Sequence, residues 1–376
     1  MGKIIRNAQL RLIRDDIVIH EGNISSGFGN IVFRLFRQFA DYMDVGVFQT
    51  VRRAHRKFEF FNRRVQKLFD SLVAFVDFVA AADFTVVKID ENSLAARLNF
   101  PLNEREKKYL RPDFARLSVL GGWFGQGRMP NLETLLTVRP DFILAWYSVR
   151  GAANDVIENM GRTLGIPVVY VRLDTLRQYA EAFEFLGRVL KREERGAALA
   201  RETRRILDEV EPVLAGIPEE GRVSVYYAQG LDGLKTECDT SVHAELINLA
   251  GGRNIHSCQA RSGFGMEPVT LEEVLLGEPE VILAKEEAFF RSVRENPAWS
   301  QVRAVRDGRV LLIPSSPFNW FDRPPSFMRI LGLCWLTKEL HPGRYSKDLV
   351  AEIKSFYRLF LGVELDDDAA WAVIGP

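Results

Sequence analysis

The sequence predicts an α/β fold of two Rossmann-like lobes that are joined by a single long helix and separated by a cleft. A phrase made of a short helix, a proline turn and a strand occurs twice, as NLETLLTVRPDFILA at 131–145 and TLEEVLLGEPEVILA at 270–284. The copies match at one constant offset, pairing Leu132 with Leu271, Glu133 with Glu272, Leu136 with Leu275, Pro140 with Pro279 and Ala145 with Ala284. FILA and VILA are continuous apolar runs, which is typical of parallel strands covered on both faces. Such units can match by chance, but the constant offset favours two related lobes.

A long helix is predicted between the two copies, at Glu193–Ile217. This stretch is rich in Ala, Leu, Arg and Glu, which are strong helix formers, and it has no glycine between Gly196 and Gly216. Apolar residues recur along it at helical spacing, so one face can pack. The pattern fits any packed amphipathic helix. Its place between the two copies favours a helix that connects two lobes.

Composition excludes several classes of protein. The chain has 376 residues, enough for two domains, and its formal net charge of zero favours neither nucleic acid nor an anionic membrane as a partner. No apolar run is long enough to span a bilayer. The three cysteines, Cys238, Cys258 and Cys334, show no CxxC spacing, so neither a zinc knuckle nor a redox motif is indicated.

The predicted units are an atypical N-terminal segment at 1–100, a first α/β lobe at 101–190, the interlobe helix at 191–217, and a second α/β lobe with terminal helices at 218–376. The first unit holds half of the 26 phenylalanines and a basic stretch between Arg52 and Lys67. It fits an amphipathic arm for a membrane surface or a partner. It also fits helices packed on the first lobe, or a segment that is not the natural N-terminus. Its start lacks the apolar region and cleavage site of a signal peptide.

In the first lobe, strands are predicted at Phe142–Trp146 and in VVYVRL, and helices at Ala152–Leu164 and Thr175–Leu190. Ligands in open α/β sheets bind beyond the carboxyl ends of the strands. Trp123 follows the strand LSVLGG and Tyr147 follows Phe142–Trp146, so both are candidates to face the cleft. The alternative is that they are rim aromatics packed on the next helix.

In the second lobe, a strand is predicted at Val223–Ala228, which places Tyr227 near its carboxyl end, and a helix at Val242–Ala250. A long loop follows with His256, Cys258 and Met266, while Cys238 and His243 lie upstream. Thiol, thioether and imidazole groups suit a transition metal, but their spacing matches no defined site. We therefore expect no metal site and keep Met266 only as a ligand contact.

A third candidate region follows the strand predicted at Val310–Ile313. Phe318, Trp320, Phe321, Arg323 and Arg329 surround the predicted helix start at Pro324 and Pro325. Aromatic faces and guanidinium groups suit a planar or anionic ligand, because arginine binds carboxylates through two hydrogen bonds and stacks on rings. The alternative is a core that closes the domain, with surface ion pairs.

From about Arg116 to His341, the chain resembles the periplasmic substrate-binding proteins of ABC importers for iron–siderophores, haem and cobalamin. The segments that resemble the family are the two repeat copies, the long helix, ELINLAGGRNI, NPAWSQVRAVRDGRVLLIP and WFDRPPSFMRILGLCWL. The resemblance implies two lobes joined by one long helix, with cargo between them. It also implies that one acid on each lobe docks onto the transporter, and Glu133 and Glu272 stand at those positions.

The resemblance further implies a monomeric binding protein without catalytic activity or intrinsic cofactor. Its cargo would be an iron(III) chelate, such as a ferric siderophore, or a related metal complex. Its partner would be a membrane permease of the ABC type, and its location periplasmic or extracytoplasmic at the membrane. The alternatives are an intracellular metal- or corrinoid-binding protein, because the start does not match a signal peptide, and an enzyme on a similar fold. No GxSxG, HExxH, P-loop or GxGxxG motif supports an enzyme.

Overall fold

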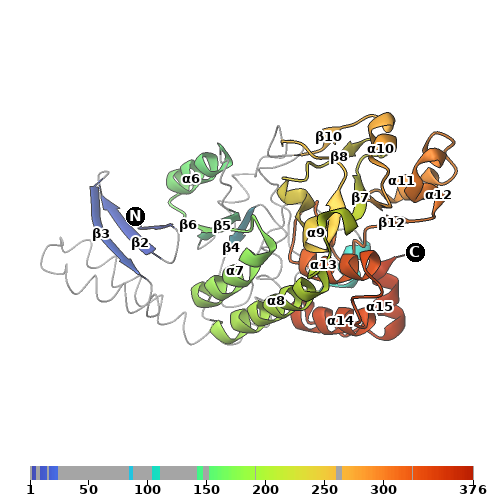
Figure 1. Ribbon diagram of the computed structural model, residues 1–376. Helices are drawn as coiled ribbons and strands as arrows, with labels where there is room; N and C mark the ends of the chain where they lie inside the picture. Colours follow the sequence, from blue (N-terminus) through green and yellow to red (C-terminus); the bar gives the residue numbers. More distant parts are fainter. Residues whose placement is uncertain are drawn as a thin grey trace, which may run out of the picture.

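The β-strands of the two repeat copies lie in different sheets. The computed structural model describes residues 2–5, 9–14, 17–23, 84–87, 104–110, 142–146, 152–190, 192–259, 265–323 and 325–375. The strand of the first copy, β5 (Phe142–Trp146), is central in a three-stranded sheet of order β4-β5-β6. The strand of the second copy, β11 (Val281–Ala284), belongs to a four-stranded sheet of order β12-β11-β7-β9. The prediction of two α/β lobes is confirmed (Figure 1).

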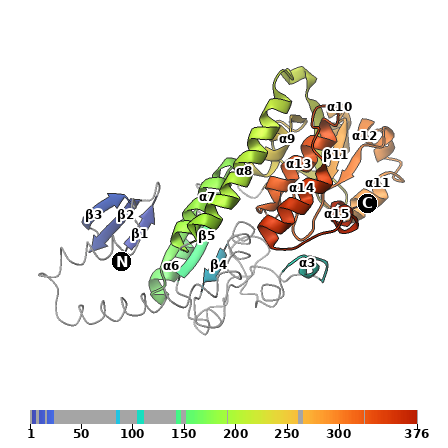
Figure 2. The same cartoon turned by 90° about the horizontal axis from the view of Figure 1, so that it is seen from below.

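The first lobe is a mixed sheet with helices. β6 (Val168–Val171) runs parallel to β5, whereas β4 (Phe84–Val87) runs antiparallel to it. The first lobe therefore includes β4, which lies before residue 101, the residue at which we expected the lobe to begin. Its helices in the described part of the chain are α6 (Ala152–Leu164) and α7 (Leu176–Val189). α3 (Glu104–Lys108) instead lies beside the C-terminal helices (Figure 2), and Tyr109 just past its end packs edge-on against Tyr357, with 5.9 Å between ring centroids. Thr175 and Gln178 form a capping box at the start of α7, which explains why the helix begins there.

The interlobe helix is α8 (Glu193–Leu214). Its C-cap is Ala215, directly before Gly216. α8 lies beside α7 and reaches toward the second lobe in both views (Figures 1 and 2). Two glycines allow the close approach where the helices meet. A Cβ on Gly196 would lie 2.4 Å from the Phe183 carbonyl oxygen, and one on Gly187 would lie 2.9 Å from the Arg192 carbonyl oxygen.

The second lobe is built on a parallel sheet. β7 (Val223–Ala228) pairs in parallel with β9 (Gly252–Asn254) and with β11, and β11 pairs in parallel with β12 (Val310–Leu312). The carboxyl ends of all these strands therefore lie at one edge of the sheet. The short elements around the sheet are η2 (Glu219–Gly221), β8 (Lys235–Thr236), η3 (Val242–Ala244), α9 (Glu245–Leu249), β10 (Glu267–Pro268), α10 (Leu271–Gly277), α11 (Glu287–Val293), η4 (Trp299–Gln301) and α12 (Arg303–Arg306).

The C-terminal helices connect the second lobe to the interlobe helix. They are α13 (Met328–Leu340), α14 (Leu349–Phe356), η5 (Tyr357–Leu361) and α15 (Asp367–Ile374). α13 is buried without a break from Met328 to Thr337, as expected of a helix that is apolar on all sides. One hydrophobic core runs from β5 and β6 through α7 and α8 to α13 and α14. The two lobes therefore share packing as well as a connecting helix.

The N-terminal segment contains three short strands, β1 (Gly2–Ile5), β2 (Gln9–Arg14) and β3 (Ile17–Asn23), which form an antiparallel sheet. The phenylalanine-rich and basic stretches of this segment lie outside the described residues. Among the helices that the structure describes, none combines the length and the apolar character needed to cross a bilayer.

Candidate functional site

Polar side chains gather at the carboxyl edge of the second sheet. Gln229 directly follows β7, and Glu237 directly follows β8. Asp322 and Arg323 come from the loop between β12 and α13, and His243 comes from η3. These residues, Gln229, Glu237, His243, Asp322 and Arg323, are called the sheet-edge cluster below. This edge of an open parallel sheet is where ligands bind.

Glu237 lies at the centre of the cluster and is fully buried. Its carboxylate accepts hydrogen bonds from Gln229 Nε2 at 2.9 Å, Ser241 Oγ at 3.1 Å and the Met266 backbone nitrogen at 3.0 Å. Arg323 Nη2 donates to the same carboxylate. A buried carboxylate is tolerated only when such donors replace water, so these contacts hold the charge in place.

Asp322 is also fully buried and lies against His243. The distance from His243 Nδ1 to Asp322 Oδ1 is 2.6 Å. Burial lowers the pKa of His243, but the negative charge of Asp322 and its hydrogen bond outweigh burial, and the net shift is upward. The geometry therefore favours a protonated, positively charged His243.

Arg323 joins the two acids. Its Nε donates to Gln229 Oε1 at 3.0 Å and lies 3.3 Å from Asp322 Oδ2. Its side chain retains 21% exposure, while both acids have none. Two carboxylates against one guanidinium leave one negative charge, which a protonated His243 cancels. The cluster therefore offers polar groups without a net positive charge.

Tyr227 lies beside the cluster at the end of β7. Its ring packs against Phe321, with 4.6 Å between ring centroids. Burial, together with the charge of Asp322, raises the pKa of the Tyr227 hydroxyl well above its usual value. That hydroxyl is buried, and no residue in the described part of the chain forms a hydrogen bond with it. An unpaired buried hydroxyl costs about 1–3 kcal/mol.

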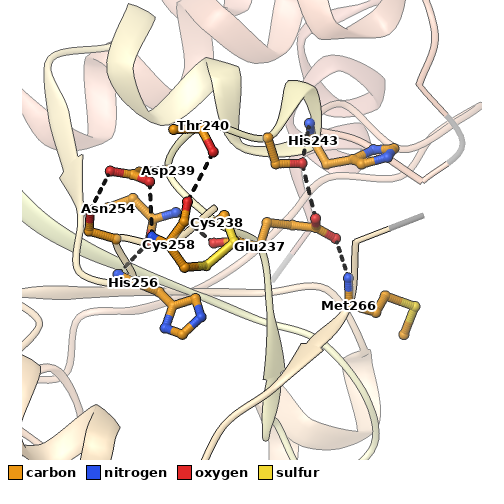
Figure 3. The surroundings of a disulfide bond; sticks show 11 residues. Glu237, Cys238, Asp239, Thr240, His243, Asn254, His256, Cys258 and Met266 are labelled. Atoms are coloured by element: carbon orange, nitrogen blue, oxygen red, sulfur yellow. Dashed lines mark hydrogen bonds between the residues drawn. A yellow bond between two sulfur atoms is a disulfide. The ribbon is translucent and has the colours of Figure 1, made fainter. Parts of the chain in front are cut away.

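The structure separates the ligand residues that the sequence predicts. Tyr227 and Arg323 lie together at the sheet edge, and the Met266 backbone contacts Glu237 while its side chain extends away (Figure 3). Trp123, Tyr147 and Glu133 lie outside the described residues. Glu272 is exposed in the first turn of α10.

Trp320 and Arg329 differ from the expectation that they face a cleft. Trp320 is fully buried, and its Nε1 donates to the Ser316 carbonyl oxygen at 2.8 Å. A Cβ on Gly332 would lie 1.8 Å from the Trp320 carbonyl oxygen, which shows how closely α13 packs on this loop. Trp320 therefore belongs to the core. This agrees with the alternative in which the aromatic residues of this loop close the domain.

Arg329 is held inside the protein, with 2% exposure. Its Nη2 donates to the Val242 carbonyl oxygen at 3.0 Å and to Glu245 Oε2 at 2.8 Å. Glu245 also accepts hydrogen bonds from the Leu176 backbone nitrogen, at 3.0 and 3.1 Å, at the start of α7. We call this arrangement the Arg329 tie. It links α13, α9 and the first-lobe helix α7, so Arg329 has a packing role here.

Sequence reasoning did not identify Gln229, Glu237 and Asp322, and it named His243 without a partner. Loop residues from three parts of the chain form the cluster, and no local spacing signals their meeting. It also did not predict a disulfide, whereas the structure has one between Cys238 and Cys258, which are 20 residues apart. Cys334 is a buried free thiol.

Comparison with known proteins identifies the family. The Periplasmic binding protein family matches residues 104–317, more than half of the chain. An ABC transporter solute binding protein from Sulfurospirillum deleyianum is 38% identical, with a TM-score of 0.72 over 81% of this chain and 91% of that one. A periplasmic solute binding protein from Veillonella parvula has the same fold at 21% identity, with a TM-score of 0.60 over 81% of this chain and 88% of that one.

A curated relative, the vitamin B12-binding protein of Vibrio parahaemolyticus, is 24% identical over 198 residues. That match covers 52% of this chain and 66% of the relative, slightly less than two thirds of its length. These relatives are named as vitamin- or solute-binding proteins, one of them of an ABC transporter, and none is named as an enzyme. The chain therefore belongs to the periplasmic binding protein family and has its two-lobed α/β fold.

Proposed function

We propose that this protein is the substrate-binding component of an ABC importer, which captures a metal chelate outside the cytoplasm and delivers it to a membrane permease. The main observation in support is the family match over residues 104–317. The 38% identical relative is named an ABC transporter solute binding protein. An extracytoplasmic location is supported by the Cys238–Cys258 disulfide, because disulfides persist mainly in oxidising compartments.

Within this function, we propose an iron(III) chelate of the siderophore type, or a related metal complex, as the cargo. Curated relatives are named vitamin B12-binding proteins, and vitamin B12 is itself a metal chelate. A bulky chelate carries hydrogen-bonding groups around its metal, which suits a protein surface with mixed donors and acceptors. Gln229, Glu237 and Asp322 are fully buried, so the sheet-edge cluster would meet such a chelate chiefly through the partly exposed guanidinium of Arg323.

The proposed cargo-facing residues of the second lobe are Arg323 and Tyr227, with Met266 at the margin. Arg323 keeps partial exposure above two buried carboxylates. The acids neutralise it, so charge on this lobe does not by itself select an anionic chelate. Trp123 and Tyr147 are the proposed stacking partners from the first lobe.

The proposed contact with the permease uses one acid on each lobe, Glu133 and Glu272. Glu272 is exposed in the first turn of α10, where the neighbouring Thr270–Glu273 capping box fixes the helix start. An exposed carboxylate at such a position pairs with permease arginines through contacts that salt weakens.

Isothermal titration tests this function with purified protein and four probes: a ferric hydroxamate, a ferric catecholate, haem and cyanocobalamin. We expect one ferric chelate to bind at one site per chain, and the same chelator without iron to bind much more weakly. Native mass spectrometry of protein purified from its host identifies cargo retained during purification. Tight binding of cobalamin alone would favour a corrinoid carrier. Binding of none of the probes, with no retained small molecule, would contradict the proposal.

A further inference from the structure

Three potential metal ligands meet beside the sheet-edge cluster. The sulfur atoms of Cys238 and Cys258 and a ring nitrogen of His256 all lie within 4.8 Å of one another. Cys238 is buried, and the other two are half-buried, so small solutes can reach the group from one side. Figure 3 shows the His256 ring next to the disulfide.

Hydrogen bonds hold the two segments together independently of the disulfide. The Asp239 backbone nitrogen donates to the His256 carbonyl oxygen at 3.0 Å, and Thr240 Oγ1 donates to the Cys258 carbonyl oxygen at 3.0 Å. The Asp239 carboxylate accepts from Ser257 Oγ at 2.8 Å and from the Cys258 backbone nitrogen at 3.2 Å. The two cysteines therefore stay close when the sulfur–sulfur bond is broken.

The His256 side chain is available as a ligand. Its backbone nitrogen donates to Asn254 Oδ1 at 3.1 Å, which fixes the start of the loop. Within the residues that the structure describes, its ring forms no hydrogen bond. A half-buried imidazole that forms no hydrogen bond within the described residues, next to two sulfur atoms and with Glu273 in electrostatic range, is arranged as in a site with one histidine and two cysteine ligands.

We propose that reduction converts the Cys238–Cys258 disulfide into a zinc site formed by both thiolates and His256. A dithiol reductant supplies two electrons and two protons; the sulfur–sulfur bond breaks, two thiols form, and the reductant becomes a disulfide. Zinc then displaces the two thiol protons and forms two bonds to sulfur and one to nitrogen. Water completes the four-coordinate shell, which is the usual arrangement for a site with three protein ligands.

This site is separate from the cargo site but is linked to it through the chain. Glu237, at the centre of the sheet-edge cluster, directly precedes Cys238, and Asn254 Nδ2 donates to the Glu237 carbonyl oxygen at 2.9 Å. Either the disulfide or the metal would therefore hold the loop that carries Glu237. The zinc site does not depend on what cargo the protein carries.

Cobalt(II) titration of the full chain tests the proposal. The protein is reduced with dithiothreitol, separated from the reductant without oxygen, and titrated beside the oxidised protein. We expect one cobalt per reduced chain, with thiolate-to-cobalt charge-transfer bands that zinc abolishes, and no such bands from the oxidised chain. Equal spectra from the two forms would overturn the proposal.

Three variants assign the ligands. Cys258→Ser should remove most of the charge-transfer intensity, and His256→Ala should weaken zinc binding by about tenfold or more. Cys334→Ser is the matched control and should bind the metal as the wild type does. Cys334 is buried, and burial raises the pKa of its thiol to about 12, so it does not readily form the thiolate that a metal binds. Loss of the bands in Cys334→Ser, or unchanged affinity in His256→Ala, would refute the assignment.

Thermal unfolding tests the proposal even if reduction lowers the stability of the protein. Zinc should raise the melting temperature of the reduced wild type, with a much smaller effect on the oxidised protein and on reduced Cys258→Ser. A reduced protein that zinc does not stabilise would also refute the proposal.

Discussion

Two arginines six positions apart, Arg323 and Arg329, have different environments and roles. Arg323, in the sheet-edge cluster, pairs with Glu237 and Asp322 and keeps 21% side-chain exposure. Arg329, in the Arg329 tie, pairs with Glu245 and has 2% exposure. Both arginines form ion pairs in the second lobe, but only Arg323 lies at the edge of the parallel sheet and is partly exposed to solvent.

This difference shows that residue type and neighbouring aromatics do not separate an arginine at the sheet edge from an arginine held in the core. Both residues follow the same strand and flank the same helix start. Arg329 lies inside α13, a helix buried on nearly all sides, whereas Arg323 precedes the helix in a loop. The position of the helix start therefore decides which guanidinium reaches solvent, and we propose that this one meets the cargo.

The largest effect on stability is expected from Arg329→Met. The variant keeps the volume but leaves Glu245 largely buried without its cation, which should lower the free energy of unfolding by about 3 kcal/mol. Urea denaturation measures this loss. The double variant with Glu245→Gln should recover part of it, because the unpaired charge is gone. A stability equal to that of the wild type would show that the Arg329 tie is not needed for packing.

A smaller effect is expected from Glu237→Gln, which tests the other region. The neutral amide cannot balance the positive charge of Arg323, so the free energy of unfolding should fall by about 1–3 kcal/mol. Thermal and urea unfolding give the value. Gln229→Glu tests charge balance with the opposite change, because it adds a third acid next to Arg323. A more stable Glu237→Gln protein would mean that the buried carboxylate is maintained for function at a cost in stability.

The pH dependence of stability should reveal His243. Because the folded pKa of His243 is raised above 6.5 by Asp322, its protonation stabilises the folded state. That stabilisation is fully present below the unfolded pKa of about 6.5 and is lost as pH rises through the folded pKa. The free energy of unfolding should be measured for the wild type and for His243→Gln between about pH 6 and about pH 9. The difference between the two proteins should shrink as the pH rises. The same difference at every pH would mean that His243 stays neutral.

The smallest effect on the isolated protein is expected from Glu272→Lys. The side chain is exposed, so stability should change by at most about 1 kcal/mol, chiefly through the helix dipole of α10. Uptake of a radiolabelled chelate by cells should fall, while cargo affinity stays unchanged. Glu295→Lys, a charge reversal at another exposed position, serves as the control. Reduced affinity in Glu272→Lys would place this residue in the cargo site.

The regular parts of the fold could be predicted because their pattern is local. The sequence predicted the bounds of β5, α6 and β7 correctly, since each apolar run is bounded by turn or capping residues. It missed β9, which has only three residues and no periodicity to detect. It placed the start of α13 too early, because the loop continues past Pro325 to Ser326, whose Oγ accepts from the Met328 backbone nitrogen.

The site was less predictable, for a physical reason. Glu237 and Asp322 are 85 positions apart in the chain, and only the parallel sheet brings their loops to one edge. The Cys238–Cys258 pair could not be assigned either, because spacing alone does not define disulfide connectivity. Tyr227 and Arg323 were named because strand ends and arginines are local features.

The most direct test of the account compares Arg323→Ala and Arg329→Met in titrations with the ferric chelate that binds best in the four-probe panel. Arg323→Ala should lose about 1.5–3 kcal/mol of binding free energy, the size of a charge-assisted hydrogen bond. Arg329→Met, measured at a temperature where it is fully folded, should bind as tightly as the wild type. The reverse order, or equal losses in both variants, would contradict the assignment of the cargo site to the sheet-edge cluster.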